Sequence, residues 1–174
     1  MKRVMRNVIE RLAGRRVVGA ALLGLVASVA GLAWRGQRLE GMELLDTRGW
    51  YTPDDAAALF GALERLDGSA AAVYAITALT IDMLFPVCYG LLFALVLRRL
   101  LPGPPLFLVP LALALSDVLE NATVAALALS FDGEPSSWAW LAAACTLVKT
   151  VLLAATLAAV AAGAALRLSE RLRR

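Results

Sequence analysis

The chain has 174 residues and a formal net charge of +3, and 60% of its residues are hydrophobic. Soluble domains average about 45–50% apolar residues, so this composition excludes an ordinary water-soluble fold and favours one integral membrane domain over residues 1–174. There is no histidine, and Cys88 and Cys145 each lie in an apolar run. These features argue against a metal site and a cysteine nucleophile, and no cofactor is predicted.

The first predicted elements are a basic segment, residues 1–16, and an apolar run, residues 17–34. Helical spacing of apolar residues in the basic segment is typical of an amphipathic helix at the membrane interface; a frayed tail is the alternative. The apolar run is near the minimum length for crossing a bilayer. A signal peptide is the rival interpretation, but the run is long for one and Trp34-Arg35 is a poor cleavage context. Small residues on one face of this span would allow close helix contacts: Ala20, Gly24, Ser28 and Gly31.

Residues 35–69 are the only sizeable polar segment, and their acids outnumber their arginines. Thr52 and Pro53, followed by two aspartates, predict a helix start, with Thr52 as the N-cap and Pro53 in the first position. A short helix over residues 56–66 would place three large apolar side chains on one face: Leu59, Phe60 and Leu63. We therefore expect a small extracytoplasmic helical loop that lies on the membrane surface.

Three further apolar segments predict spans over residues 70–97, 106–130 and 138–166. Pro86 removes a backbone donor within the second, so a kink is expected near residues 82–86. Most of the 17 basic residues fall on one side of this topology and the acidic loops on the other. This pattern predicts cytoplasmic N- and C-termini. The predicted fold class is an all-α four-helix transmembrane bundle, and the Arg-, Ala- and Leu-rich composition suggests a bacterial inner (plasma) membrane.

Strongly polar side chains occur at mid-membrane depth in the last three predicted spans. Asp82, Asp117 and Lys149 lie about 14–16 Å along their spans at 1.5 Å per residue, near the middle of a hydrocarbon core of about 30 Å. Each ionised group at that depth costs on the order of 2.5–3.5 kcal/mol, so we expect these groups to face one another between helices. The candidate pocket residues are Asp82, Tyr89, Asp117, Glu120, Asn121 and Lys149.

The predicted pocket has three carboxyls and a single ammonium group, that of Lys149. If all were ionised, the net charge would be about −2, which a dry interior does not hold. Either some carboxyls are protonated, or a cation or polar ligand enters. The structural alternative is that an acid, Lys149 and Asn121 only fix the packing of the bundle.

Two runs on adjacent predicted helices carry a resemblance. Residues 82–89 have the form D-x-x-F-P-x-x-Y, and residues 117–121 have the form D-x-x-E-N. From about Tyr74 to Asn121 the chain resembles a group of small bacterial four-span membrane proteins of unassigned function. The resemblance implies a four-span membrane fold and brings no activity with it.

Three functions stay open on the sequence. The pocket could handle protons, cations or small solutes, because mid-membrane carboxyls and proline-broken helices form transport sites. The chain is small for a transporter unless it forms a homo-oligomer, which the sequence allows. Alternatively, Asp117 and Glu120 could be the general acid and base of an intramembrane lipid-modifying enzyme. Hydrolase motifs are absent from the sequence, so we favour a protein that is not an enzyme. The third alternative is a non-catalytic membrane subunit. The lipid bilayer is the expected partner, nucleic acid is not expected, and the ligand is unknown.

Overall fold

The computed structural model describes residues 14–102 and 105–173, so the predicted interfacial helix of residues 1–16 lies almost wholly outside the described residues. The described chain forms helices and no strand. Four segments are long and apolar enough to cross a membrane, which confirms an all-α bundle with four candidate spans. The elements are α2 (Arg15–Arg38), η1 (Leu45–Thr47), α3 (Pro53–Leu66), α4 (Ala70–Leu79), α5 (Ile81–Leu100), α6 (Leu108–Leu129) and α7 (Ala139–Leu172).

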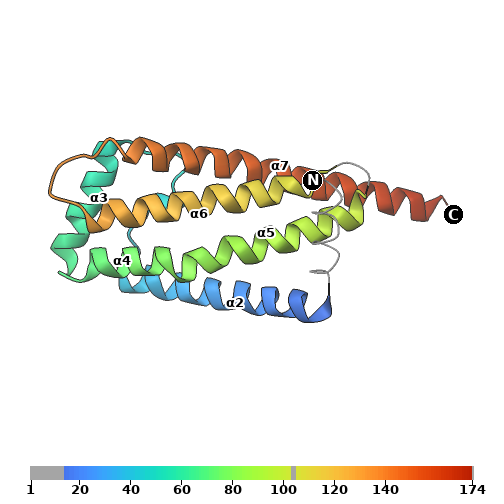
Figure 1. The fold of residues 1–174 in the computed structure, drawn as a ribbon, viewed down its shortest axis with the longest axis horizontal. Coiled ribbons are helices and arrows are strands. Elements are labelled where there is room, and N and C mark those ends of the chain that lie inside the picture. The colour runs from blue at the N-terminus through green and yellow to red at the C-terminus, as the bar shows by residue number, and fades with distance from the viewer. Residues whose placement is uncertain (1–13, 103–104, 174) are drawn as a thin grey trace.

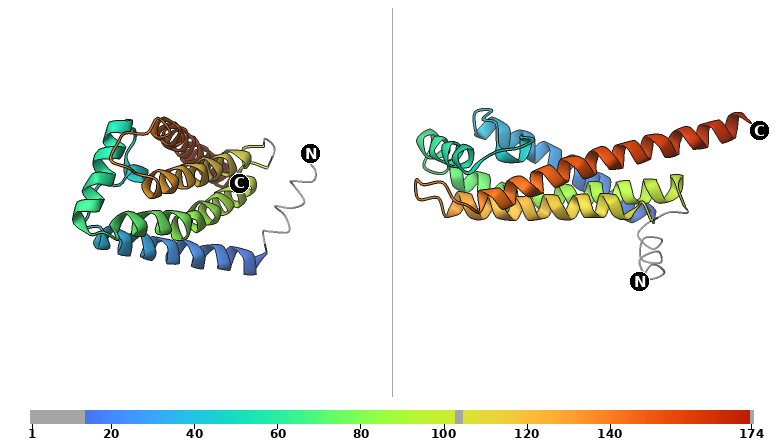
Figure 2. Two further views of the ribbon diagram at one scale, coloured as in Figure 1. Left: turned by 60° about the vertical axis from the view of Figure 1, so that its left-hand side comes forward. Right: turned by 90° about the horizontal axis from the view of Figure 1, so that it is seen from above.

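The long helices run side by side, and α3 lies across one end of them (Figure 1). We call this end the α3 end. α5 is central, because α2, α6 and α7 all pack against it, while α7 packs mainly against α6. The right-hand view in Figure 2 shows α7 extending well beyond the other helices at its C-terminal end. The larger apolar core lies at the α3 end, where α3, α4, α6, α7 and the segment between α2 and α3 meet.

α3 begins as the sequence predicts. The Thr52 side chain accepts a hydrogen bond from the Asp55 backbone N–H at 3.2 Å, and the Asp55 carboxylate accepts the Thr52 backbone N–H at 2.8 Å, which forms a capping box. Hydrogen bonds from the side chain and backbone of Thr52 lower the pKa of the Asp55 carboxyl. The predicted apolar face of Leu59, Phe60 and Leu63 is buried, so the expectation for this helix is confirmed.

The segment before α3 is packed more deeply against the bundle than the sequence predicts. Arg35 to Arg38 still belong to α2, and residues 39–52, which we call the re-entrant loop, fold into the α3 end of the bundle. The physical reason is burial of large apolar side chains, at roughly 1.5–3 kcal/mol for each leucine. Irregular backbone is tolerated at membrane depth when protein surrounds it. The buried side chains are Leu39, Leu44, Leu45 and Tyr51, and burial raises the pKa of the Tyr51 hydroxyl.

The second span is interrupted at Thr80, just before the predicted kink region of residues 82–86. Thr80 has φ −121° and ψ −82° and separates α4 from α5, and α5 runs on through Pro86. The proline ring crowds the turn that precedes it and leaves the Asp82 carbonyl without its helical donor. The distortion therefore lies on the N-terminal side of the proline.

The small-residue face of α2 packs against α5. A Cβ atom added at Gly24 would lie 2.7 Å from Cys88 Sγ, and one at Gly31 would lie 2.8 Å from the Ile81 side chain. Close approach through small residues is the usual way in which membrane helices pack. This face is therefore used within one chain, and an interface between copies would need another surface.

Gly90→Ala is expected to destabilise the protein by about 1–3 kcal/mol through overpacking. The added Cβ would lie 2.7 Å from the Ala114 Cβ and 3.1 Å from the Pro110 carbonyl oxygen, and the backbone of α6 cannot rotate away. Thermal unfolding in detergent measures the loss. Gly19→Ala is the matched control, since its Cβ would meet nothing within 4 Å. Equal stability of the two variants would contradict the close contact of α5 with α6.

Candidate functional site

Lys149 on α7 contacts three oxygen atoms, two from α6 and one from the re-entrant loop. Its Nζ lies 2.6 Å from Glu120 Oε2 and 3.2 Å from Asp117 Oδ1, both on α6. It also donates to the backbone carbonyl of Asp46 in the re-entrant loop at 3.2 Å. The contacts with Asp117 and Asp46 are hydrogen bonds, whereas the contact with Glu120 is an ion pair, and Glu120 Oε2 has no hydrogen-bond partner among the described residues.

Arg35, one turn before the end of α2, bridges two further carboxylates. Its Nη1 donates to Asp82 Oδ2 on α5 at 2.9 Å, and its Nη2 donates to Asp46 Oδ2 at 2.5 Å. The Tyr74 hydroxyl donates to the other oxygen of Asp46 at 3.1 Å, and the guanidinium lies 5.5 Å from the centre of the Tyr74 ring. The Nε of Arg35 is buried without a hydrogen-bond partner among the described residues.

These contacts join six ionisable side chains into one network, which we call the polar cluster. Asp46 connects its two halves, because its carboxylate binds Arg35 while its backbone carbonyl binds Lys149. The polar cluster brings four carboxyls and two cations together from four helices and one loop. Its members are Arg35, Asp46, Asp82, Asp117, Glu120 and Lys149.

The structure places all six sequence-predicted pocket residues in or against the polar cluster. Tyr89 donates its hydroxyl proton to Asp117 Oδ2 at 2.7 Å. Glu120 is fully buried, and its Oε1 accepts a hydrogen bond from the Thr146 hydroxyl at 2.7 Å. The Asn121 side-chain amide donates a hydrogen bond to the backbone carbonyl of Asp82. The convergence expected from the cost of isolated charges in a membrane is therefore present in the fold.

Sequence reasoning missed two members of the polar cluster, Arg35 and Asp46. The sequence alone assigns both to the outer loop, because Arg35 directly follows the apolar run and Asp46 lies in the polar segment. A signal for Arg35 was present: it follows Ser28 by seven residues and Gly31 by four, so it shares the face that packs against α5. The predicted pocket had three carboxyls and one ammonium group, and this imbalance also indicated that a second basic side chain lies nearby. Nothing in the local sequence marks Asp46.

Asn121 has a structural role that the D-x-x-F-P and E-N runs do not reveal by themselves. Pro86 has no N–H, so the carbonyl of Asp82, four residues earlier, loses its usual helical donor. The Asn121 side-chain amide donates to that carbonyl at 2.8 Å. Asn121 therefore replaces the hydrogen bond that the proline removes, which explains why the two runs complement each other across α5 and α6.

Asn121→Leu is expected to destabilise the protein by about 1–3 kcal/mol, the cost of one unsatisfied buried polar group. The Pro86→Ala background should reduce this loss, because an alanine at that position would supply the backbone N–H that the Asp82 carbonyl lacks. A double-mutant cycle of thermal stabilities in detergent measures the coupling. Additive losses would show that Asn121 does not act by satisfying that carbonyl.

A groove with two lobes borders the polar cluster. The lobe beside the end of α2 has a volume of about 410 Å³, and the lobe between α2 and α7 has about 670 Å³. Both volumes fall within the roughly 300–1,000 Å³ of small-molecule sites. The residues that line both lobes are Asp46, Thr47, Phe85, Asp117 and Lys149. The charged groups therefore face a space that is large enough for a ligand.

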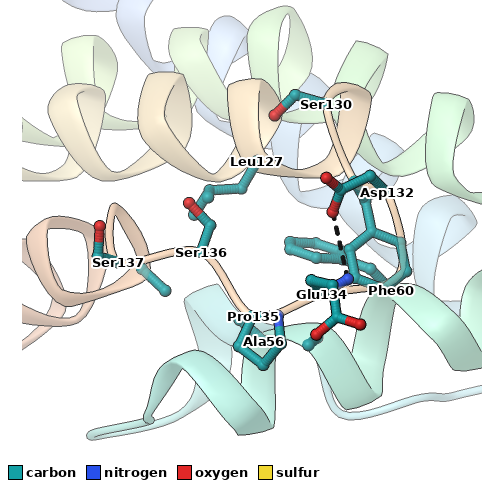
Figure 3. A pocket seen from close by; sticks show the side chains of 12 residues that line it. Ala56, Phe60, Leu127, Ser130, Asp132, Glu134, Pro135, Ser136 and Ser137 are labelled. Atoms are coloured by element: carbon teal, nitrogen blue, oxygen red, sulfur yellow. Dashed lines mark hydrogen bonds between the residues drawn. The ribbon is translucent and has the colours of Figure 1, made fainter.

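A separate cavity of about 350 Å³ lies at the α3 end, between α3 and the loop that joins α6 to α7. Figure 3 shows its lining, in which the Asp132 carboxylate accepts the backbone N–H of Glu134 at 3.2 Å. This bond is local to the turn, and the polar side chains around the cavity do not converge on one point (Figure 3). The groove beside the polar cluster is therefore the better candidate site.

No family model, curated protein or solved structure matches this chain. The function must therefore be inferred from the geometry and charge of the polar cluster.

Proposed function

We propose that this protein binds a small cationic solute at the polar cluster and exchanges it for protons within the membrane. The observation that carries this proposal is the charge balance of the polar cluster, in which four carboxyls meet only Arg35 and Lys149 among the described residues. With every group ionised the net charge would be about −2, and burying uncompensated charge is costly. Protons or an entering cation would neutralise the excess.

Asp117 is the carboxyl best placed for this exchange. It lines both lobes of the groove, and it is bonded at one oxygen to Lys149 and at the other to Tyr89. Glu120 is instead fully buried behind Lys149 and Thr146. This difference weighs against the lipid-modifying enzyme, because the two carboxyls would have to share one substrate as acid and base.

The proposal includes an orientation and a location. Arg98 and Arg99 end α5, and Arg167 on α7 donates to the carbonyls of Leu100 and Arg99. The acidic turn around Asp132 and Glu134 lies at the α3 end. By the positive-inside rule we propose that the α3 end is extracytoplasmic and that both termini lie in the cytoplasm of a bacterial cell. Membership of the group with the D-x-x-F-P-x-x-Y and D-x-x-E-N runs, and a homo-oligomeric assembly, are part of this proposal.

A liposome flux assay tests the proposal. Purified protein is reconstituted with a pH-sensitive dye inside the vesicles, and gradients of tetramethylammonium, choline, Na⁺ or K⁺ are imposed. The organic ions are permanently charged and do not cross lipid as neutral bases. A cation-linked change in internal pH at least tenfold faster than in protein-free vesicles is the expected result, and Asp117→Asn should reduce it to background.

Glu64→Gln is the matched control, because Glu64 is an exposed acid on α3 outside the polar cluster; its flux should equal that of the unsubstituted protein. Unchanged flux in a folded Asp117→Asn protein, or no cation-linked flux in the unsubstituted protein, would refute the proposed function.

A further inference from the structure

The larger lobe of the groove is built by every candidate span. α2 contributes Leu25 and Val29, α5 contributes Phe93, and α7 contributes Leu153 to its apolar part. Its polar part includes Asp46, Asp117 and Lys149 of the polar cluster, together with Arg48 and Thr150. One cavity of about 670 Å³ therefore has a charged end and an apolar end, which is the shape of a site for an amphiphile.

The apolar end extends along α5 away from the α3 end. Phe85, Tyr89 and Phe93 follow one another at intervals of four residues, with ring centres 5.2 Å and 6.3 Å apart. From Phe85 to Phe93 the wall covers about 12 Å at 1.5 Å per residue. A hydrocarbon chain lying along this wall would have its polar end beside Asp117.

The groove is accessible from the side of the bundle. Val29 and Leu153, on the two helices that flank the larger lobe, are 53% and 40% exposed. Both residues lie within candidate spans, where the surrounding medium is lipid. An amphiphile dissolved in the bilayer could therefore reach the lobe laterally, with its chain still in an apolar environment.

The charge and bonding of the polar end favour a cationic head group. The two cations that line this lobe are already paired: Lys149 with Glu120 and Asp117, and Arg48 with Glu43 at 3.9 Å. Asp82, whose Oδ1 has no hydrogen-bond partner among the described residues, lines the smaller lobe beside it. The aromatic rings of Phe85 and Tyr89 line the same lobe as Asp117, and aromatic faces with a nearby carboxylate are suited to alkylammonium groups. The lining of the lobe itself has two acids and two bases, but the polar cluster that it borders has four carboxyls and two cations. A carboxylate or sulfate head group would add to that excess of negative charge.

We infer that the solute is a single-chain alkylammonium amphiphile, which enters from the bilayer between α2 and α7 and places its ammonium head beside Asp117, with its chain along Phe93 and Leu153. This inference rests on the proposed function and specifies its substrate class. It assigns separate parts of the groove to the head group and to the chain.

Binding to the full chain in phosphatidylcholine nanodiscs tests the inference with four probes. Dodecyltrimethylammonium is compared with tetramethylammonium, which has the same head and no long chain, and with dodecanol and dodecyl sulfate, which have the same chain and other heads. Affinity is measured as mole fraction in the bilayer, with empty nanodiscs subtracted. We expect dodecyltrimethylammonium to bind at least tenfold more tightly than each of the others.

Leu153→Trp should remove the advantage of the long chain by filling the apolar end. Val151→Trp is the matched control, since Val151 is 59% exposed on the same helix and does not line the lobe. It should leave the affinity unchanged.

Equal affinity for the long and short ammonium ions would overturn the inference, because the groove would then not hold a chain; the proposed cation site would survive. Tighter binding of dodecyl sulfate or dodecanol than of dodecyltrimethylammonium would overturn the inference, because the site would then not prefer a cationic head group. Binding of no ammonium ion, together with no cation-linked flux in liposomes, would overturn both.

Discussion

Lys149→Met is expected to destabilise the protein by about 3–5 kcal/mol, the usual cost of removing one partner from a buried ion pair. The lysine is the only cation within 4.0 Å of Glu120 and Asp117 among the described residues, and Glu120 is fully buried. Without the ammonium, both carboxylates would remain in an apolar interior with no counter-charge. Thermal unfolding in detergent, followed by helix content, measures the loss.

A second substitution separates charge from packing. Lys149→Met combined with Glu120→Gln should recover more than half of the lost stability, because the fully buried negative charge is then also removed. The deficit of the single variant should shrink as the pH falls, since a protonated carboxyl needs no counter-charge. A single variant as stable as the unsubstituted protein would contradict the central place of Lys149 in the polar cluster.

The double variant also addresses function. If the polar cluster only holds the helices together, a stable Lys149→Met/Glu120→Gln protein should have the same activity in the cell as the unsubstituted protein. If the polar cluster binds a cation in exchange for protons, the same stable protein should show a changed cation-linked flux in liposomes.

Arg35→Met is the second substitution with a large expected effect, again a loss of about 3–5 kcal/mol. Arg35 is 3% exposed and pairs with both Asp46 and Asp82. Its loss would leave two carboxylates unpaired and would free the re-entrant loop from α2. Thermal unfolding measures the stability, and faster maleimide labelling of a cysteine introduced at Thr47 would report movement of the loop.

Arg38→Met provides a matched control on the same helix. Arg38 also binds an aspartate, Asp67, at 3.0 Å, but both side chains are largely exposed. Exposed pairs contribute about 0–1 kcal/mol, so this variant should be nearly as stable as the unsubstituted protein. Similar losses for the two arginines would show that burial does not set the strength of these contacts.

The sequence was sufficient to predict the parts of this fold that depend on hydrophobic length and local spacing. The four spans follow from apolar runs, and the start of α3 follows from Thr52 and Pro53. The convergence of Asp82, Asp117, Glu120 and Lys149 follows from the cost of a lone charge in lipid. Each of these predictions needs only the chain's own periodicity and the properties of the bilayer.

The sequence was not sufficient where a tertiary contact outweighs local polarity. The re-entrant loop contains many polar residues, yet burial of Leu45 and Tyr51 packs it against the bundle. This packing places Asp46 within hydrogen-bond distance of both Arg35 and Lys149. The role of Asn121 depends on which carbonyl Pro86 exposes, and on α6 lying beside α5. Such pairings across the fold have no signature in local periodicity.

The positions of the glycines show where the backbones of neighbouring helices approach closely. Gly24 and Gly31 fix α2 against α5, Gly90 fixes α5 against α6, and a Cβ at Gly163 would lie 2.9 Å from the Leu100 Cβ, so α7 is fixed as well. The re-entrant loop has no such close backbone contact at its described glycines. Residues 46–49 of this loop line the larger lobe, so a guest that drew Asp117 away from Lys149 would disturb the ammonium that holds the loop's Asp46 carbonyl.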